Sequence, residues 1–363
     1  MKKNNKLVTG LVAIAVIVII VISLNGSNGK QADSINIGVI TSLTGLISGG
    51  DNLGQGFANG ITLAKEEYAK AHPEKKINVF IEDDNFDSKK GASAYQKLVS
   101  INKIDTLINL SSPTIDVISK DVHDSGMLTF QLGAESDPIA DNIYQIYPDQ
   151  TSIGVMGDVA NKDEVKKVVI AMQQFKAYEK FVSDFTKTYK GEVEIQRIST
   201  SEKDMSSIAL KIKESNPDGL LIFMEAKDGA KLVRKLKDFN AVPKHMYFDI
   251  NLQFGINDYK DALGGLSTLN GSKSLYSAAE MTKEFQEKYK VRFNQNVSML
   301  SGFGYDAYMT AINLYDKDQS KWKSNIEKYK AMGVTGEIRF NDVGMRPPQF
   351  KIGEIINGEL TVK

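Results

Sequence analysis

The sequence has 363 residues, of which 42% are apolar and 25% charged, a globular composition with room for two domains of common size. Lys plus Arg and Asp plus Glu both total 45, so no basic surplus favours nucleic acid as a partner. The absence of cysteine excludes disulfides, thiol catalysis, cysteine-ligated zinc and a lipidated N-terminal cysteine. The three histidines, His72, His123 and His245, lie far apart in sequence, and we expect neither a metal site nor a cofactor.

The N-terminal segment has the pattern of a membrane anchor. Residues 1–6 carry three lysines, and residues 7–24 carry no charge. At about 1.5 Å per residue, a helix over 7–24 spans roughly 27 Å, close to the hydrocarbon thickness of a bilayer. We expect residues 1–6 to be cytoplasmic, 7–24 to anchor the chain, 25–34 to form a polar tether and the remainder to be extracytoplasmic. The alternative is a cleaved signal peptide, which leaves a periplasmic or secreted protein.

From residue 35 onward, segments with strand and helix character alternate. A first series has strands at 35–40, 76–84, 104–110 and 127–133 and helices at 54–72, 88–101 and 114–126. A second has strands at 165–173, 193–199, 218–225 and 245–250 and helices at 178–191, 205–216 and 229–240. Helices near 274–290, 301–317 and 319–332 follow, then a strand at 336–340 and a hairpin over 349–362. This alternation predicts an α/β fold with two doubly wound parallel-sheet lobes.

The segment 41–60, "TSLTGLISGGDNLGQGFANG", contains six glycines after the first predicted strand. Gly54, Gly56 and Gly60 do not have the spacing of a dinucleotide fingerprint, and no Gly-Lys-Ser/Thr motif of a phosphate loop occurs. One interpretation is a loop at the carboxyl end of a strand, where backbone N–H groups and a helix N-terminus favour an anionic ligand group. The other is that the glycines merely ease a long surface loop.

Four motifs in order resemble the solute-binding proteins of branched-chain amino acid ABC transporters, which are type I periplasmic binding proteins. They are "INIGVITSLTG…GQGFANGITLAKEE", "INVFIEDDNFDSKKGASAYQKLV", "SGFGYDAYMTAINL" and "FKIGEIINGEL", and the resemblance covers about residues 33–363. No motif of a hydrolase or a metalloenzyme occurs. Because Asp83 and Asp84 are adjacent on a predicted strand, their side chains point to opposite faces, and we expect them to cap the sheet end rather than to catalyse. We therefore expect no enzymatic activity.

The resemblance implies two lobes joined by a three-segment hinge. Lobe 1 would comprise residues 33–148 and 272–343, and lobe 2 residues 149–271 and 344–363. A small molecule would be captured in the cleft by hinge closure and delivered to the subunits of an ABC permease. The alternative is a membrane-tethered sensing module of the same fold that acts with a signalling partner.

The resemblance also implies ligand contacts in lobe 1. Ser112 matches the family serine that holds a ligand carboxylate, and Ser111 adjoins it, although an ordinary helix cap is the alternative for Ser112. Gly133 takes the place of a small residue that contributes backbone groups, whereas Glu135 replaces a threonine or serine and would repel a carboxylate. A further two positions, at which the family commonly has aromatic residues, are occupied by Leu53 and Leu300.

In lobe 2 the same resemblance points to three residues. Tyr178 lies near an aromatic position of the family, Glu225 stands at the end of a predicted strand where the family often has an aromatic residue or glycine, and Asp249 lies near an acidic position that holds a ligand ammonium. Together, Glu135, Glu225 and Asp249 would make an acidic cleft, unless each is a solvated loop residue. We expect an amino-acid-like ligand that is cationic or neutral rather than a dicarboxylate.

Overall fold

The computed structural model of the chain describes residues 34–45, 52–132, 141–148, 153–277 and 281–362. The predicted anchor at 7–24, the cytoplasmic segment 1–6 and nearly all of the tether 25–34 lie outside the described residues. Within these ranges, no helix combines the length and the apolar character that a membrane crossing requires.

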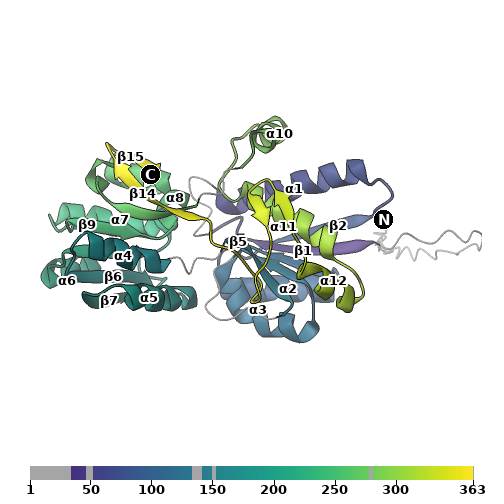
Figure 1. Cartoon of the computed structure of the whole chain (residues 1–363), viewed down its shortest axis with the longest axis horizontal. Helices are drawn as coiled ribbons and strands as arrows, with labels where there is room; N and C mark the ends of the chain where they lie inside the picture. The colour runs from purple at the N-terminus through teal and green to yellow at the C-terminus, as the bar shows by residue number, and fades with distance from the viewer. Residues whose placement is uncertain (1–33, 46–51, 133–140, 149–152, 278–280, 363) are drawn as a thin grey trace, which may run out of the picture.

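The chain builds two large sheets that lie side by side along the long axis of the molecule (Figure 1). In spatial order, the first contains β13 (Met345–Arg346), β5 (Ile143–Pro148), β4 (Thr129–Gln131), β3 (Thr106–Asn109), β1 (Ile35–Thr41) and β2 (Ile77–Asp83). The second contains β15 (Glu359–Val362), β14 (Phe350–Ile356), β10 (Lys273–Ser277), β9 (His245–Phe248), β8 (Gly219–Phe223), β6 (Lys167–Gln173) and β7 (Glu192–Ile198). We call each sheet with its helices a lobe, lobe 1 holding the first sheet and lobe 2 the second.

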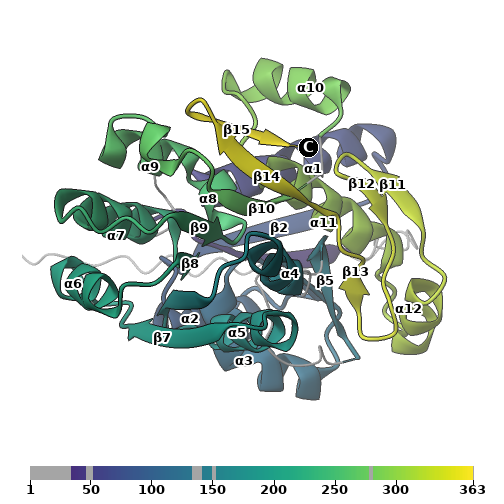
Figure 2. The same ribbon diagram turned by 60° about the vertical axis from the view of Figure 1, so that its left-hand side comes forward.

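Helices cover both faces of each sheet (Figure 2). Lobe 1 has α1 (Leu53–Ala71), α2 (Ser88–Ser100), α3 (Ser112–Ser125), α10 (Lys283–Phe293), α11 (Ser301–Leu314) and α12 (Gln319–Ile326), and a small hairpin of β11 (Ala331–Gly333) and β12 (Gly336–Ile338). Lobe 2 has α4 (Gly154–Lys162), α5 (Lys176–Thr188), α6 (Ser206–Ser215), α7 (Ala226–Asp238), α8 (Asn251–Phe254) and α9 (Ile256–Leu263).

Alternation along the buried strands explains this layering. Leu107 and Ile108 are adjacent in β3 and fully buried, but Leu107 packs with α2 and α3, whereas Ile108 packs with α1 and α11. Val168 and Val169 divide in the same way between the two cores of lobe 2. The pairs within the first sheet are all parallel, and in the second only β14 runs antiparallel to its neighbours. The predicted α/β fold with two doubly wound lobes is confirmed.

The chain passes between the sheets after β5, after β10 and after β13. β10 pairs with β9 and β14, so residues 273–277 lie in the second sheet, although 272–343 was predicted for lobe 1. β13 pairs with β5 in the first sheet, although 344–363 was predicted for lobe 2. The prediction of a helix near 274–290 is therefore wrong at its start, because sheet pairing holds residues 273–277 extended and α10 begins only at Lys283.

The glycines of α1 serve close packing within lobe 1. A Cβ atom on Gly54 would lie 1.9 Å from the carbonyl oxygen of Ser42, and one on Gly60 would lie 1.9 Å from that of Ser301. From the other side, a Cβ atom on Gly304 of α11 would lie 2.1 Å from the carbonyl oxygen of Phe57. These glycines therefore let α1 lie close to α11 and to the end of β1. For the glycines of α1, neither earlier interpretation holds, because they line neither a ligand-binding loop nor a loose surface loop.

Candidate functional site

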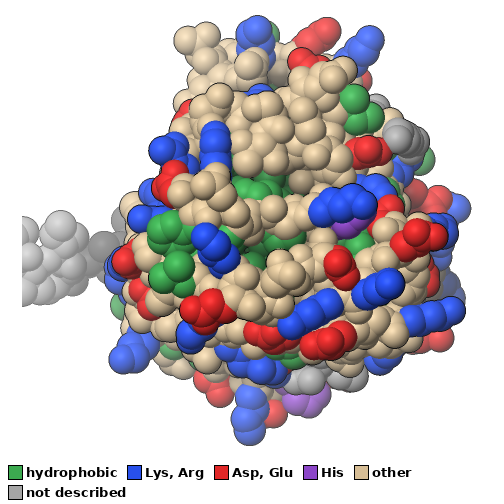
Figure 3. All heavy atoms as spheres, turned by 90° about the vertical axis from the view of Figure 1, so that its left-hand side faces the viewer, with side chains coloured by type: hydrophobic (Ala, Val, Ile, Leu, Met, Phe, Trp, Pro, Cys, Tyr) green, Lys and Arg blue, Asp and Glu red, His purple; other side chains and the backbone are tan. Residues whose placement is uncertain are grey.

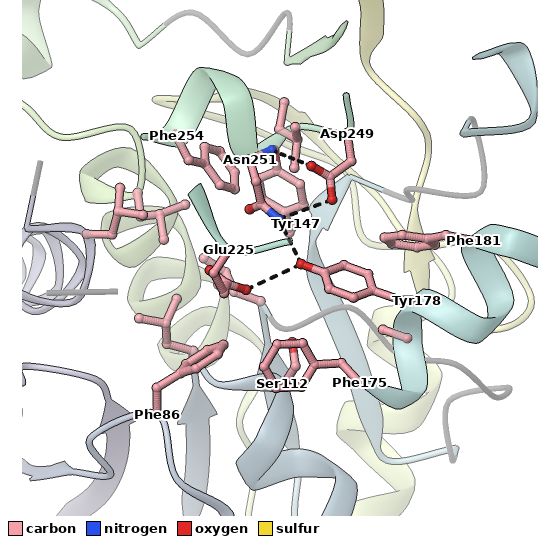
Figure 4. Close-up of a pocket in the computed structure, with 16 residues that line it drawn as sticks. Phe86, Ser112, Tyr147, Phe175, Tyr178, Phe181, Glu225, Asp249, Asn251 and Phe254 are labelled. Carbon is pink, nitrogen blue, oxygen red and sulfur yellow. Dashed lines mark hydrogen bonds between the residues drawn. The ribbon is translucent and has the colours of Figure 1, made fainter. Parts of the chain in front are cut away.

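A cavity of about 730 Å³, counting the open solvent at its mouth, lies between the two lobes (Figure 4). Most of its walls come from the segments that follow β2, β3 and β4 in lobe 1 and β6, β8 and β9 in lobe 2, and the start of α1, strand β5 and the residue before α11 complete them. Ligands of parallel α/β sheets bind at this carboxyl edge. The lining residues are Leu53, Phe86, Leu110, Ser112, Leu132, Tyr147, Phe175, Ala177, Tyr178, Phe181, Glu225, Asp249, Ile250, Asn251, Phe254 and Leu300.

Aromatic rings from both lobes enclose the cavity. Phe86 of lobe 1 meets Phe175 of lobe 2 edge to face, with 5.8 Å between ring centroids. Phe175 in turn lies edge to face with Tyr178 at 5.6 Å, and Tyr178 stacks on Phe223 at 6.0 Å. Ring pairs at these separations are favourable beyond the area that they bury. The cavity therefore has an apolar wall to which both lobes contribute.

Two carboxylates of lobe 2 are joined through a tyrosine and an asparagine (Figure 4). Asp249, only 2% exposed, accepts hydrogen bonds from the backbone N–H of Asn251 at 2.9 Å and from its side-chain Nδ2 at 3.1 Å. The same Nδ2 donates to the Tyr178 hydroxyl at 2.8 Å, and that hydroxyl donates to Glu225 Oε1 at 3.4 Å. The described residues that line the cavity include no Lys, Arg or His, so neither carboxylate meets a positive charge there.

This environment changes the protonation of both acids. Burial raises the pKa of Glu225 to about 7, against a weaker lowering by the Tyr178 hydrogen bond, and the nearby charge of Asp228 raises it further. Burial also raises the pKa of Asp249 well above its ordinary value, although its hydrogen bonds with Asn251 oppose the shift. A carboxylate without a cation partner is disfavoured in a dry site. Burial therefore favours the protonated form of both acids, and a positively charged group beside them would favour their ionisation.

On the lobe 1 side, the start of α3 reaches the cavity through Ser112. The N-cap of α3 is Ser111, not Ser112, and the Ser111 side chain makes no capping hydrogen bond. Ser111 Oγ is buried and has no hydrogen-bond partner among the described residues. The N-terminal end of a helix carries a partial positive charge, so this is the part of the cavity most favourable to an anionic group.

The acidic pair Asp83–Asp84 holds the turn that carries Phe86. Asp83 Oδ1 accepts from the backbone N–H groups of Leu43 at 3.0 Å and Asn85 at 2.9 Å. Asp84, fully buried, accepts from the Ser42 hydroxyl at 2.6 Å and from the backbone N–H of Phe86 at 3.0 Å. As predicted, the two acids cap the end of the sheet. Their hydrogen bonds stabilise a turn in which Phe86 has φ of 56°, a conformation unusual for a bulky residue.

The structure brings most of the predicted site residues together. Those that line the cavity are Leu53, Ser112, Tyr178, Glu225, Asp249 and Leu300. Ser111 is buried beside Ser112, and Gly133 and Glu135 lie outside the described residues. A contact between any of these residues and a ligand stays a prediction.

Sequence reasoning missed the other ten residues of the lining, namely Phe86, Leu110, Leu132, Tyr147, Phe175, Ala177, Phe181, Ile250, Asn251 and Phe254. A signal for two of them was present. Phe86 and Phe175 each stand two residues beyond the end of a predicted strand, at 84 and 173, at the carboxyl edge where the ligand was expected. An aromatic residue just past such a strand end is a candidate for the wall of the cleft.

The surface of the lobe 2 end carries both signs of charge. Figure 3 looks onto this end and shows Lys and Arg interspersed with Asp and Glu. On this face the mixture forms no single-sign patch of the kind that a nucleic acid would select.

Comparisons with known proteins give a family match and a set of similar folds. A family model described as periplasmic binding protein matches residues 34–348. No curated protein matches the chain in sequence.

Among solved structures, the chain is similar to the branched-chain amino acid transporter substrate binding protein LivJ from Streptococcus pneumoniae in complex with isoleucine, with 18% identity over 91% of this chain and 98% of that one, and a TM-score of 0.77. It is also similar to the leucine binding protein LivK from Thermotoga maritima, with 19% identity over 91% and 97% and a TM-score of 0.77. A solute binding protein of an ABC transporter from R. palustris, in complex with 4-hydroxybenzoate, has 19% identity over 91% and 96% and a TM-score of 0.76. At these identities the likeness concerns the fold.

Proposed function

This chain belongs to the periplasmic binding protein family, and from that premise we propose that it captures a small molecule, an amino acid or a related compound, between its lobes and delivers it to an ABC permease. Capture would proceed by hinge closure and would involve no chemical step. The protein would act outside the cytoplasm, held at the membrane by residues 7–24.

The observation that carries this proposal is the composition of the cavity wall. Lobe 1 contributes Phe86 and Ser112, and lobe 2 contributes Tyr178, Glu225 and Asp249, so one bound molecule would touch both lobes. A ligand shifts an equilibrium between open and closed forms only by its differential affinity for them. A molecule that touches both lobes at once binds the closed form better, which is the physical requirement for capture by closure.

The ends of the cavity support an amino-acid-like ligand. The start of α3 at Ser112 suits a carboxylate or another polar group, and the lobe 2 acids suit an amine. Proteins of similar fold have been solved with a zwitterion, isoleucine, and with an acid, 4-hydroxybenzoate. A ligand screen should therefore include both of these classes, together with the amines that the lobe 2 acids suit.

The test is a ligand screen on the extracytoplasmic part of the chain. Thermal unfolding would be measured with basic, neutral and acidic amino acids, amines, amides and aromatic acids. At a hundredfold excess over its dissociation constant, a ligand adds about 2.7 kcal/mol to the free energy of unfolding. Any compound that raises the melting temperature would then be examined by small-angle X-ray scattering, where closure reduces the radius of gyration. Identical dimensions with every such compound would contradict capture by closure.

A further inference from the structure

Resting on this proposed function, we infer that the cavity selects an organic ammonium ion with a bulky apolar body, aromatic or of similar size, and no carboxylate. The inference names the ligand class of the site, which neither the family nor its solved relatives assign.

The first step is the charge of the cavity. Its two acids, Glu225 and Asp249, come from adjacent strand ends of lobe 2 and share the link through Tyr178 and Asn251. The nearest further acid, Asp228, has an ion pair with Lys231 at 2.7 Å and does not need a ligand cation. Glu225 and Asp249 have no such partner among the lining residues. A buried carboxylate is stable when a cation accompanies it, so a ligand ammonium would be the partner that favours the ionised form of these acids.

The second step concerns the segments outside the described residues. The four internal ones, 46–51, 133–140, 149–152 and 278–280, read "LISGGD", "GAESDPIA", "DQTS" and "AAE". They contain Asp and Glu but no Lys, Arg or His. In the described lining of the cavity, Glu225 and Asp249 are likewise the charged residue types present. When these acids are ionised, the charge of the described lining is negative.

The third step is the apolar wall. Phe86, Phe175 and Tyr178 lie along one side of the acids, and Leu53 and Leu300 are part of the same lining. Aromatic faces attract cations, by about 0.5–1 kcal/mol at exposed sites and about 2 kcal/mol when the cation is desolvated. A small, fully hydrated cation would make no apolar contacts with these side chains, whereas an amine with an apolar body would pack against them.

The fourth step is the weakness of the anion site. In the described part of lobe 1, the polar side chain that lines the cavity at the α3 start is Ser112, and Pro113 beside it has no N–H to donate. A ligand carboxylate there would have few donors and would face the lobe 2 acids across the cavity. An amine without a carboxylate avoids this cost.

The experiment uses matched sets of ligands that share one body. A first set is 2-phenylethylamine, phenylalanine and 3-phenylpropionate, and further sets carry benzyl, indolylethyl and isobutyl bodies. Affinities would be measured by isothermal titration calorimetry at pH 8, where Glu225 is mostly ionised. In the set whose body fits best, we expect the amine to bind at least tenfold tighter than the zwitterion, and the acid not to bind. Tighter binding of a zwitterion or an acid in that set would overturn the inference and leave capture by closure intact. If no member of any set binds and no other compound in the screen does, the proposed function fails as well.

Variants test the role of the acids. Glu225→Gln and Asp249→Asn are each expected to weaken amine binding at least tenfold, whereas Glu214→Gln, an exposed acid on α6, serves as the matched control. Circular dichroism and thermal unfolding of the free variants would establish that they fold. Unchanged amine affinity in folded Glu225→Gln and Asp249→Asn would overturn the inference.

Proton release gives a second readout. Because burial raises the pKa of Glu225 to about 7, the binding of an ammonium ion at pH 7 should ionise the remaining protonated fraction. The measured enthalpy should then differ between phosphate and Tris buffers for the wild type, and differ less for Glu225→Gln. Equal buffer dependence in the two proteins would contradict the pairing of the ligand amine with Glu225.

Discussion

The ring of Phe86 in lobe 1 contacts the ring of Phe175 in lobe 2, edge to face at 5.8 Å and 81° between ring planes. The two residues follow strands of different sheets, Phe86 after β2 and Phe175 after β6, so this contact exists only while the lobes are close together. It also lies in the lining of the cavity, between the ligand space and the outer part of the cleft. The pair therefore links lobe closure to enclosure of the ligand.

Phe86→Ala should weaken ligand binding by removing a contact specific to the closed form. An aromatic pair contributes about 0.5–1.5 kcal/mol, which corresponds to roughly a threefold to tenfold loss of affinity. Phe86→Gly provides the matched comparison, because φ of 56° is strained for alanine but free for glycine. We expect both variants to lose affinity equally in calorimetry, while the free Gly variant melts at a higher temperature than the free Ala variant. Wild-type affinity in both would show that the ring pair plays no part in closure.

The stability of the ligand-free protein should fall as pH rises from 4.5 to 7. Unfolded, Glu225 ionises near 4.5, but burial raises its folded pKa to about 7, so the unfolded state binds fewer protons within this window. The full loss, complete above pH 7, is on the order of 3 kcal/mol for a shift of this size. Burial also raises the pKa of Asp249, so its ionisation likewise lowers the stability as pH rises. The other titratable or charged groups that face Glu225 are Tyr178 and the Asp228–Lys231 ion pair.

Urea unfolding of the wild type and Glu225→Gln at several pH values would measure this effect. The wild-type advantage over the variant should be greatest below pH 4.5 and decline to a plateau above pH 7. A constant difference between the two proteins from pH 4 to 8 would mean that Glu225 titrates normally.

Tyr178→Phe should raise the pKa of Glu225 further. The Tyr178 hydroxyl donates to Glu225 and thereby opposes the effect of burial. The variant also removes the acceptor of the hydrogen bond from Asn251, and a net loss of about 0.5–1.5 kcal/mol of stability is expected per hydrogen bond. A ¹³C NMR titration of the glutamate carboxyls would follow Glu225, identified by its absence in Glu225→Gln. A midpoint at or below that of the wild type would contradict the assigned direction of this hydrogen bond.

Ser112→Ala should separate two classes of ligand. A hydrogen bond to a charged group is worth about 1.5–3 kcal/mol, so a ligand that places a carboxylate at the start of α3 should lose roughly tenfold or more in affinity. An amine without a carboxylate should bind within twofold of the wild type. The N-cap of α3 is Ser111, so the melting temperature of the free variant should stay nearly unchanged. Ser93→Ala on the exposed face of α2 is the control. If Ser112→Ala weakened the binding of amines and of carboxylates equally, Ser112 would affect binding through the stability of the fold and not through a contact with the carboxylate.

Gly60→Ala should destabilise lobe 1 even though alanine is the better helix former. The added Cβ would lie 1.9 Å from the carbonyl oxygen of Ser301, and relieving such a clash costs about 1–3 kcal/mol or more. The gain in helix propensity is only about 1 kcal/mol. Urea unfolding should show a lower midpoint for this variant, and little change for Lys70→Ala, a substitution of an exposed residue in the same helix. A more stable Gly60→Ala would show that α1 and α11 have room to separate.

Most of the fold could be predicted because most strands of the parallel sheets are short apolar runs followed by a helix of ordinary length, although β5 was not predicted. The strand at 273–277 could not be predicted, because its sequence "KSLYS" contains polar residues and is no apolar run. It is a strand because it pairs with β9 and β14. The two-residue strand β13 is likewise defined by its partner β5 and by the buried side chain of Arg346, which donates to the carbonyl oxygen of Thr335 at 2.8 Å. Such elements carry no periodic signal of their own.

The site was harder to predict than the fold. Glu225 and Asp249 stand at the C-terminal ends of predicted strands, and their position at the sheet edge follows from topology alone. The function of the glycines in α1 could not be inferred, because close approach to a ligand and close approach to α11 demand the same residue. The meeting of Phe86 with Phe175 depends on how the two lobes stand to each other, which no local pattern specifies.

The antiparallel strand β14 has a consequence for biosynthesis. It joins the second sheet at β10, yet it follows the whole of lobe 1 in the order of translation. Until residues 350–356 leave the ribosome and the export channel, β10 has an unpaired edge, and unpaired strand edges promote aggregation. For an interval during synthesis, lobe 1 can therefore fold, while the exposed edge of lobe 2 must be prevented from pairing with other chains.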